Sequence, residues 1–519
     1  MEKRVAIIGA GISGLLACKY TLDKGFQPVV FESQSTIGGV WAQTIESTKL
    51  QTPKHAFQFS NLPWPSYVKD LYPTHTQVME YIESYAQQFN LLPFIRFGCE
   101  VIGMDFFGVS EEEMELWDLW GGNGRPFSPK GKWLLQVKDK KRCSQEEYKF
   151  EFVILCMGRY SGSPNIPDEF PLGHDAQTFN GKVVHSMEYS AMDDANVKEM
   201  IKGKRIVVVG AQKSALDIAA ECANVNGIHR PCTMIERTVN WAVPSSYSNL
   251  DFLFLSRFSE LMVHKPNETF LHTFLATLLS PLRWAISKLV ESYLRCELPL
   301  SKYNMVPKHS FMEQFSSCKV PILPDNFYRM VEEGSIILKK SQSLSFCSEG
   351  LVIDGEVEPL QTDVVILATG FKSDEKLKNI FVSRTFQQYI KGPLTTQVPL
   401  YRQIIHPRIP QLAIIGFSES LSNLHAFEIQ CRWLAHFLYG SFELHGIREM
   451  EKEIVQWENY TKRCGGKFRW RSCCIAIPIW YNDQMCRDMG CEPKRKKGFF
   501  AEWFEPYGPL DYVGLTMAQ

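Results

Sequence analysis

The sequence predicts an α/β fold in which two parallel-sheet units are interleaved along the chain. In two places, some 200 residues apart, an apolar strand leads into a turn of small residues and then into an apolar helix. Two further apolar runs, "EFVILCMG" at 151–158 and "DVVILATGF" at 363–371, each end in a small residue and glycine. Such runs are typical of the late strand that closes a nucleotide-binding sheet.

The first turn follows the apolar strand Val5–Ile8 and has the spacing G-x-G-x-x-G. Because a helix with apolar spacing begins at Ile12, the order strand, turn, helix is the one that a Rossmann-like dinucleotide site requires. Gly9 allows the tight turn, Gly11 lets the backbone approach a pyrophosphate, and Gly14 lets helix and strand pack closely. The residues expected to contact the cofactor here are Gly9, Ala10, Gly11, Ile12, Ser13 and Gly14.

The next apolar strand, "PVVFE", ends at Glu32, about 20 residues beyond the turn, where an acid accepts hydrogen bonds from a ribose 2′-hydroxyl. An acid there disfavours a 2′-phosphate, so the site suits FAD or NAD. The alternative is that Glu32 is a solvated charge at the end of a strand. The following "STIGGVW" places Gly39 and Trp41 where they would line an extended flavin, and we therefore expect FAD.

The second turn, within "RIVVVGAQKSALD" at 205–217, repeats this pattern in a degraded form. Gln212 stands where the second glycine belongs, and Ala215 where the third does. The strand that follows ends in Glu236 and Arg237, and a guanidinium there would take a 2′-phosphate, which favours NADPH. The alternative is that Arg237 is an ordinary surface charge. The expected NADPH contacts are Gly210, Ala211, Gln212, Lys213, Ser214, Ala215 and Arg237.

These motifs predict two interleaved Rossmann-like domains, a larger one for FAD and a smaller one for NADPH inserted into it. We expect the first part of the FAD domain at 1–170, the NADPH domain at 171–330 with an inserted helical segment at about 250–310, and the rest of the FAD domain at 331–519. The run 151–158 would close the first sheet, and 363–371 would close the inserted domain. Two dinucleotide sites imply that hydride passes from one cofactor to the other.

Composition excludes several classes of partner. The formal net charge is −1, without a long block of one sign, so nucleic acid is not expected. "MEKR" runs directly into the first strand and leaves no room for a signal peptide, so we expect a cytoplasmic protein. The fifteen cysteines are scattered and lack paired C-x-x-C spacing. We therefore expect no metal site, and cysteines that are mostly small buried hydrophobic residues.

The strongest candidate for membrane contact is "FLHTFLATLLSPLRWAISKLV" at 270–290. Its charge-free stretch is too short for a span of about 20 residues. We expect a pair of core helices broken at Pro281, or a lid over a site. Peripheral contact with the cytosolic face of a membrane is the less favoured alternative.

The segment "FNGKVVHSMEY" has the pattern F-x-G-x-x-x-H-x-x-x-Y, formed by Phe179, Gly181, His185 and Tyr189. With both nucleotide turns, "GGVW" and "LATGF", it resembles the signature of the flavin-containing monooxygenases over nearly the whole chain. Within that family the chain resembles the plant branch close to the pipecolate N-hydroxylase, through "TKLQT", "FSNLPWP", "HSMEY" and "SSCK". The resemblance implies an architectural role for His185.

The resemblance also implies an activity. NADPH reduces FAD, the reduced flavin takes up O₂ as a C4a-hydroperoxide, and one oxygen atom passes to a soft nucleophile of a small molecule. We expect N-hydroxylation of an amine or amino acid. The alternatives are S-oxygenation, a Baeyer-Villiger or decarboxylative step, and a non-catalytic nucleotide-binding protein. A disulfide reductase would need a redox C-x₂₋₄-C beside the flavin, and the "GGVW" region has none.

Two residues are candidates for the flavin's surroundings. Many family members carry an asparagine near the reactive edge of the flavin, and the matching residue here is Gln51, a longer amide with the same hydrogen-bonding groups. An ordinary loop position is the alternative. Ser422 and Asn423 are candidate N-caps of a helix whose N-terminus would stabilise the reduced ring at its pyrimidine edge.

Overall fold

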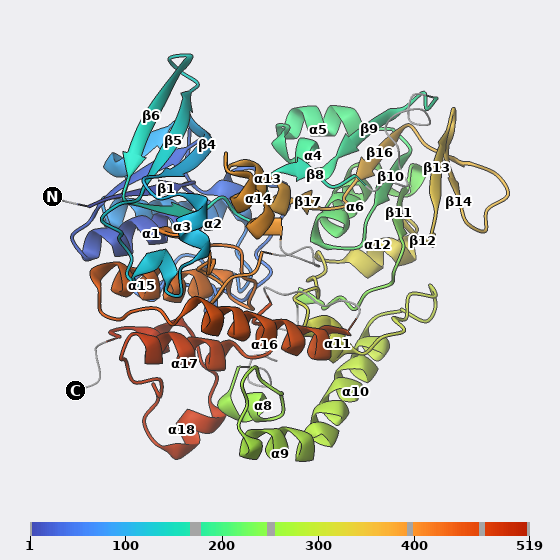
Figure 1. The fold of residues 1–519 in the computed structure, drawn as a ribbon. Coiled ribbons are helices and arrows are strands. Elements are labelled where there is room, and N and C mark those ends of the chain that lie inside the picture. Colours follow the sequence, from blue (N-terminus) through green and yellow to red (C-terminus); the bar gives the residue numbers. More distant parts are fainter. Residues whose placement is uncertain (1–2, 167–177, 246–254, 392–397, 467–472, 516–519) are drawn as a thin grey trace.

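The structure is a computed structural model and describes residues 3–166, 178–245, 255–391, 398–466 and 473–515 (Figure 1). Two parallel sheets lie side by side, each with its own helices. Below them, in the orientation of Figure 1, lies a layer of helices contributed by the middle and the end of the chain.

The first sheet has the order β18-β7-β1-β2-β3, with every pair parallel. Its last strand along the chain, β18, pairs with β7 although the whole second sheet intervenes in sequence, so the chain returns to this unit. Val5 and Ile7 pack against helices α1, α2 and α15, whereas Ala6 and Ile8 pack on the antiparallel sheet of β4, β5 and β6. The elements are β1 (Arg4–Ile8), α1 (Ile12–Asp23), β2 (Gln27–Glu32), α2 (His75–Gln88), β3 (Ile95–Phe97), β4 (Cys99–Phe107), β5 (Lys132–Asp139), β6 (Ser144–Phe150), β7 (Phe152–Leu155), β18 (Leu412–Ile414) and α15 (Asn423–Tyr439).

The second sheet has the order β12-β11-β10-β16-β9 and is also parallel. Val208 faces α6 and α12, and its neighbours Val207 and Val209 face the hairpin of β13 and β14. The fold class expected from the sequence, α/β with two interleaved Rossmann-like units, is confirmed. The elements are β9 (Lys182–His185), β10 (Ile206–Val209), α6 (Lys213–Asn226), β11 (Cys232–Glu236), α12 (Phe327–Glu333), β12 (Ile336–Lys340), β13 (Leu344–Cys347), β14 (Gly350–Ile353), β15 (Leu360–Gln361) and β16 (Val364–Leu367).

The boundary expected at residue 330 lies inside this second unit and needs correction. Strands β12 and β16 come after residue 330, yet they are hydrogen-bonded to β11 and β10. The unit ends only where β17 (Phe371–Lys372) pairs antiparallel with β8 (Ser163–Pro164). The chain segment that leaves the first unit and the one that returns to it therefore run side by side, as a short two-stranded ribbon.

Of the two core helices expected at 270–290, α9 is mostly exposed, whereas α10 buries Ser287 and Val290. The chain does break beside Pro281, between α9 and α10, but Ala276 is the only buried residue of α9, and Phe270 is 88% exposed. No helix of the described residues is long and apolar enough to cross a membrane. Of the inserted helical segment expected at about 250–310, residues 250–254 lie outside the described residues. The layer consists of α8 (Arg257–Leu261), α9 (Phe270–Leu278), α10 (Ser280–Glu297), α11 (Phe311–Phe315), α16 (Ile447–Gly465), α17 (Pro478–Asp488) and α18 (Phe499–Phe504).

The remaining helices are short and lie between strands along the chain. They are α3 (Glu111–Glu115), α4 (Ser186–Ala191), α5 (Asp194–Ile201), α13 (Ser373–Asn379) and α14 (Arg384–Lys391). His185 ends β9 and caps α4, because its Nδ1 accepts the backbone N–H of Met187 at 3.1 Å. Burial lowers the pKa of His185, and its bond to Met187 joins the end of β9 to the start of α4.

Candidate active site

The first glycine turn is tight enough to exclude any side chain at two of its three glycines. Gly9 has φ 106°, and a Cβ there would lie 2.4 Å from the carbonyl oxygen of Cys156. A Cβ on Gly14 would lie 1.9 Å from the carbonyl oxygen of Gly9. The strand and the helix therefore touch at Gly14, and the turn leaves its backbone bare.

Gly11 has a different role, because a Cβ there would meet nothing closer than Gly39 Cα, at 3.6 Å. Gly11 caps α1 without a side-chain hydrogen bond in the described structure, so the first N–H groups of the helix, from Ile12 and Ser13 onward, suit an anion. The backbone at Gly39 forms the other wall, and Gly38 N–H donates to Ala10 O at 3.0 Å. Such a bare cradle fits the pyrophosphate of a dinucleotide.

Glu32 ends β2 beside this cradle and is buried. Its carboxylate accepts the backbone N–H of Ala10 at 2.7 Å and that of Gln34 at 2.8 Å. These two bonds fix the carboxylate next to the turn, where a ribose would lie. Trp41 is half-buried, and its ring packs edge-on against Phe57, with centroids 6.2 Å apart. The residues of this unit thus fit FAD.

The second turn keeps the shape of the first despite its changed sequence. Gly210 has φ 148°, and a Cβ there would lie 2.5 Å from Ala368 O. Gln212 caps α6 with φ −108° and ψ −177°, close to the φ −73° and ψ −174° of Gly11. This is ordinary extended backbone, so glutamine adopts it without strain. Ala215, buried in the first turn of α6, replaces the third glycine at the helix–strand contact.

The side chains of this turn are partly engaged with the first unit. Lys213 Nζ lies 2.5 Å from Asp217 Oδ1, and Asp217 Oδ2 accepts the hydroxyl of Thr48 at 2.8 Å. Burial raises the pKa of Asp217, and Lys213 and Thr48 counteract that rise. Ala211 and Ser214 are half-buried, so their backbone remains open to a ligand.

Glu236 occupies the place that Glu32 has in the first unit. Gly9 N–H donates to Phe31 O at 2.8 Å, and Gly210 N–H donates to Ile235 O at 3.0 Å. Glu32 and Glu236 directly follow these two acceptors and therefore hold equivalent positions in the two units. Burial raises the pKa of Glu236 to about 8, against the opposing effect of Lys340. A protonated Glu236 brings no negative charge against a 2′-phosphate. Arg237, the expected phosphate partner, is exposed beside it.

The raised pKa of Glu236 predicts that the stability of the protein depends on pH. Because its pKa is raised in the folded protein, its contribution is fully present below the ordinary pKa of glutamate and is lost as pH rises toward about 8. A tenfold change in proton affinity corresponds to about 1.4 kcal/mol. We expect Glu236→Gln to match the wild type in acid and, above pH 8, to exceed its free energy of unfolding by several kcal/mol, up to about 5. Urea unfolding across the pH range measures this. Glu199→Gln, an exposed control, should change nothing, and parallel curves for wild type and Glu236→Gln would contradict the prediction.

Three distant segments meet beyond the first turn, at the ends of β7 and β18. The hydroxyl of Thr52 donates to Leu421 O at 2.7 Å, and that of Ser422 donates to Ala56 O at 2.6 Å. Gln51 is exposed at this junction, and its Oε1 accepts the N–H of Ile322 at 3.4 Å. Gln51 therefore lies where a loop of the second unit meets the first.

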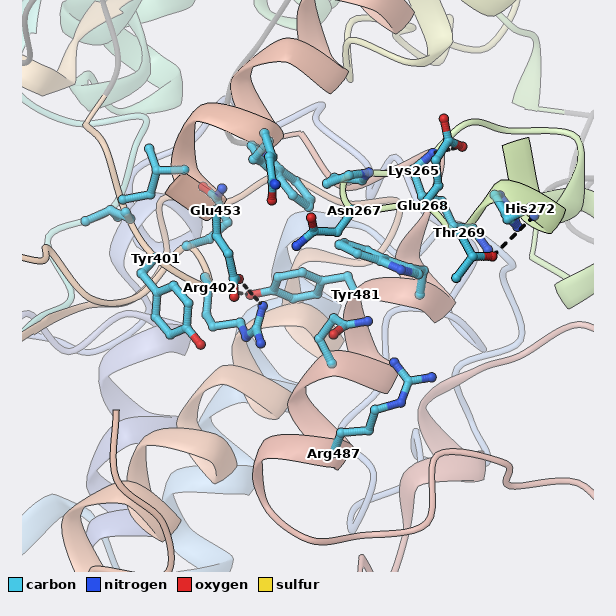
Figure 2. Close-up of a pocket in the computed structure, with 18 residues that line it drawn as sticks. Lys265, Asn267, Glu268, Thr269, His272, Tyr401, Arg402, Glu453, Tyr481 and Arg487 are labelled. Atoms are coloured by element: carbon cyan, nitrogen blue, oxygen red, sulfur yellow. Dashed lines mark hydrogen bonds and ion pairs between the residues drawn. The ribbon is translucent and has the colours of Figure 1, made fainter. Parts of the chain in front are cut away.

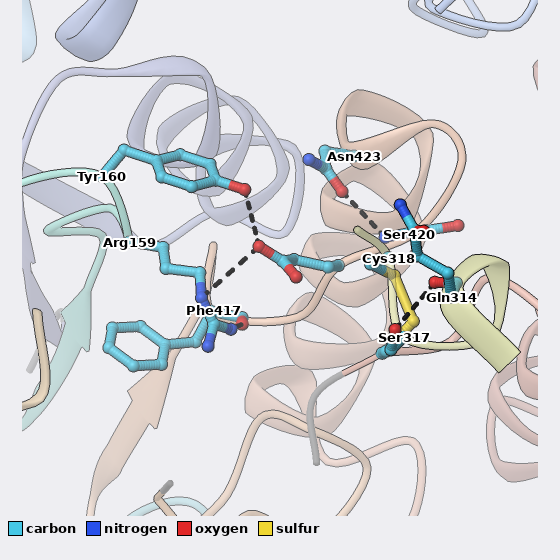
Figure 3. Close-up of a disulfide and its surroundings, with 10 residues drawn as sticks. Arg159, Tyr160, Gln314, Ser317, Cys318, Phe417, Ser420 and Asn423 are labelled. Atoms are coloured by element: carbon cyan, nitrogen blue, oxygen red, sulfur yellow. Dashed lines mark hydrogen bonds and ion pairs between the residues drawn. A yellow bond between two sulfur atoms is a disulfide. The ribbon is translucent and has the colours of Figure 1, made fainter. Parts of the chain in front are cut away.

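The N-terminus of α15 borders the same junction (Figure 3). Ser422 caps the helix by accepting the N–H of His425 at 3.4 Å, so Ser422 is the N-cap. Asn423 is the first helical residue, and its Oδ1 accepts the N–H of Ser420 at 2.8 Å. A Cβ on Gly416 would lie 2.9 Å from Ser13 Oγ, so the strand that leads to α15 touches the first glycine turn.

The junction also holds buried charges that sequence patterns did not single out. Glu419 accepts the hydroxyl of Tyr160 at 2.6 Å, and Arg159 Nε lies 3.5 Å from the same carboxylate (Figure 3). Arg159 also donates to Phe417 O at 2.7 Å. Lys319 is half-buried nearby; burial lowers its pKa, and Glu419 counteracts this effect. Only the position of Arg159, just after a strand of a parallel sheet, could have drawn attention to it.

The structure pairs two of the cysteines, which the sequence did not indicate. Cys318 and Cys473 form a disulfide with Cα atoms 6.0 Å apart, between the loop after α11 and a segment that pairs with Glu419 (Figure 3). Most other cysteines are buried, as expected. Among the described residues no cluster of His, Cys, Asp or Glu suits a metal ion.

Comparison with known proteins identifies the family. The family model for flavin-binding monooxygenase-like proteins matches residues 2–500. The chain is 39% identical over 518 residues to the probable flavin-containing monooxygenase 1 of Arabidopsis thaliana, covering 98% of this chain and 96% of that one.

The chain belongs to the flavin-containing monooxygenase family. It lies on the plant side of the family, since it is also 34% identical to the putative flavin-containing monooxygenase 2 of Arabidopsis thaliana but 26% identical to flavin-containing monooxygenase 3 of the dog, each over 95% of this chain. It is thus an FAD- and NADPH-dependent oxidoreductase. Solved monooxygenase structures share its fold: a cyclohexanone monooxygenase has a TM-score of 0.64 at 17% identity, covering 93% of this chain and 97% of that one. The S-allyl-L-cysteine S-oxygenase of Allium sativum has a TM-score of 0.57 at 17% identity, covering 94% and 89%.

Proposed function

We propose that this monooxygenase N-hydroxylates a small amine or amino acid at the junction of its two units. The observation that carries the proposal is the set of charges at the junction, formed by the buried Arg159 and Glu419 and the half-buried Lys319. Arg159 and Glu419 already pair with each other, and a junction lined by charged groups in this way suits a charged or zwitterionic substrate better than an apolar ketone. A carboxylate would pair with the cations, and Glu419 would accept a hydrogen bond from the amine.

The remaining site residues would hold the cofactors around this junction. FAD would lie along Gly9–Gly14, Glu32 and the Gly39–Trp41 segment, and NADPH along 210–215 with Arg237. When bound, the flavin supplies the activated oxygen. The amide of Gln51 would donate a hydrogen bond at the reactive edge, and Asn423 would hold the loop before α15 so that its N-terminus stabilises negative charge.

Product analysis tests this proposal. The purified holoenzyme is supplied with NADPH, O₂ and one substrate at a time: a cyclic amino acid, a primary amine, a thioether and a ketone. We expect the N-hydroxylated product to form in proportion to the NADPH consumed, with little hydrogen peroxide. A sulfoxide or a lactone as the main product would replace the proposal by the corresponding alternative, and peroxide alone would show uncoupled reduction.

The proposed anchoring group has its own test. Lys319→Met removes a cation at the junction, so we expect the KM for the amino acid to rise about tenfold while reduction of the flavin by NADPH is unchanged. Lys308→Met, an exposed residue in the same region, is the matched control. An unchanged KM for Lys319→Met would remove this lysine from the substrate site.

We further propose that the exposed face of the helical layer rests on an anionic lipid surface. Helix α18 packs on α8, through Phe258 and Phe504 at 5.2 Å between ring centroids, and α8 contacts α9, so the face is continuous. Its basic counterpart is the exposed Lys494 and Lys497, which precede α18 and suit anionic headgroups. The exposed apolar side chains are Phe270, Leu271, Phe274, Leu278, Leu282, Trp284, Phe499, Phe500 and Phe504.

Co-sedimentation with phosphatidylcholine–phosphatidylserine vesicles tests the lipid contact. We expect Phe270→Ser with Phe500→Ser to lower the bound fraction about tenfold, since each buries a large apolar side chain in the bilayer boundary. Leu116→Ser, which removes an exposed leucine beside α3, is the control. Absence of binding by the wild type, or self-association through this face in light scattering, would contradict the proposal.

A further inference from the structure

We propose that a pocket lined by α16 and α17, separate from the nucleotide turns and the junction, binds a small planar aromatic carboxylate. The pocket has a volume of about 430 Å³ and is bordered by the loop that enters α9 and by the turn at 400–403 (Figure 2). That volume suits a molecule of one or two fused rings. None of its lining residues belongs to the nucleotide turns or to the junction described above, so this inference does not depend on the proposed function.

Aromatic rings form one wall of the pocket. Trp457 and Trp480 lie with their ring centroids 6.0 Å apart and their planes 27° from parallel. Tyr481 stands against Trp457 at 64°, with a centroid distance of 6.2 Å. Trp457 is buried, whereas Trp480 is half-buried and offers its surface to the pocket. A flat ring would extend this stack.

Arg487 supplies a guanidinium whose N–H groups can bind a ligand. The only carboxylate within 4.0 Å of it in the described part of the chain is Asp483, at 3.9 Å. Asp483 is already held by the two Nη atoms of Arg257, at 2.6 and 3.0 Å. The Arg487 side chain is 54% exposed, and Figure 2 places it at one end of the pocket. Its guanidinium can therefore bind a carboxylate with two parallel hydrogen bonds.

The other charged groups of the pocket are already matched. Arg402 donates to Glu453 at 2.7 Å and to both oxygens of Asp488, at 2.8 and 3.1 Å. Glu268 accepts the N–H of Lys265 at 3.2 Å and faces His264 Nδ1 at 3.0 Å. Lys265 Nζ lies 3.8 Å from Glu260. The side chains of Lys265 and Arg402 are only 14% and 12% exposed, so in the described structure Arg487 is the exposed cation of the pocket, which indicates a monoanion.

The backbone around the pocket is held in an uncommon conformation. Asn267, Arg402 and Gln403 all line it and have φ of 53°, 52° and 58°, in the left-handed region that non-glycine residues rarely adopt. The ion pairs of Arg402 and the hydroxyl of Tyr481, which donates to Arg402 O at 2.7 Å, hold this turn. Backbone strain of this kind accumulates at ligand sites, where it preorganises the pocket.

Calorimetric titration of the holoenzyme with naphthoate tests the proposal, with neutral naphthamide as the charge control. We expect naphthoate to bind and naphthamide to bind about tenfold more weakly. Arg487→Gln should weaken naphthoate about tenfold without affecting naphthamide, and Arg448→Gln, an exposed arginine on α16, should affect neither. Absence of naphthoate binding, or equal losses in the two arginine variants, would overturn the assignment.

The aromatic wall has a separate test. Trp480→Leu should weaken both probes, because both lose the ring that they stack on, and Trp284→Leu, an exposed tryptophan on α10, should leave both unchanged. Flavin content and NADPH oxidation report that each variant is folded. Unchanged binding to folded Trp480→Leu would place the probe elsewhere and end the proposal.

Discussion

Gly14→Ala is expected to yield a destabilised protein that does not retain flavin. The added methyl group would lie 1.9 Å from the carbonyl oxygen of Gly9, which is backbone and has no rotamer to escape into. The helix must then move away from the strand, and the cradle for the pyrophosphate opens. Overpacking of this kind costs about 3 kcal/mol, which exceeds the gain of about 1 kcal/mol from replacing glycine by alanine in a helix.

Flavin absorbance per polypeptide, together with the thermal midpoint, measures this effect. Gly25→Ala is the matched control: its φ is 79°, but no atom lies within 4 Å of the added methyl, so only a small loss of stability and full flavin content are expected. Gly11→Ala separates fold from binding, since its methyl meets no closer atom than Gly39 Cα at 3.6 Å. It should keep the fold and lose affinity for FAD. Full flavin content in Gly14→Ala would refute the packing argument.

Loss of the Cys318–Cys473 disulfide is expected to have the second large effect. The two cysteines are 155 residues apart, and the chain-entropy relation gives about 5 kcal/mol for a loop of that length. The bond also joins the loop after α11 to the segment that pairs with Glu419. Its loss should therefore both destabilise the protein and loosen the junction between the two units.

Urea unfolding of oxidised protein, with and without reductant, measures the contribution. Cys318→Ser should unfold at lower urea than the wild type, and reductant should not change it further. Cys143→Ser, an exposed free cysteine, should behave as the wild type. If reductant leaves the wild-type midpoint unchanged, the bond contributes no stability under those conditions.

The local parts of the fold could be predicted from the sequence. The order strand, glycine turn, helix depends on residues that are close in sequence. Both nucleotide turns and their strands could therefore be predicted from the spacing of apolar residues and the positions of glycine and alanine. Gln212 looked like a weakness of the second turn, yet its backbone is extended and tolerates any side chain. A motif records which residues are common at a position, whereas the conformation decides which are allowed.

The parts that could not be predicted depend on contacts between distant segments. The domain boundary predicted at 330 was wrong because β12 and β16 belong to the second sheet although they come later in the sequence. Which sheet a strand joins depends on contacts with strands that are distant in sequence. The pairing of Cys318 with Cys473 cannot be deduced from spacing. Helix α9 carries an apolar pattern that suits a core, and only its place at the edge of the layer leaves that pattern uncovered.

The short ribbon of β8 and β17 carries both connections between the two sheets. They are tied together by Asn165, which donates from its side chain to Thr369 O at 3.0 Å. Glycines at 158, 162 and 370, with φ of 71°, 107° and 92°, flank the ribbon. The two connections thus leave the flavin-binding unit at one place and are held in register with each other there. The Cys318–Cys473 disulfide and the hydrogen bond from Ile322 N–H to Gln51 join the same junction elsewhere, so the orientation of the nicotinamide-binding unit is set at three separate points of the chain.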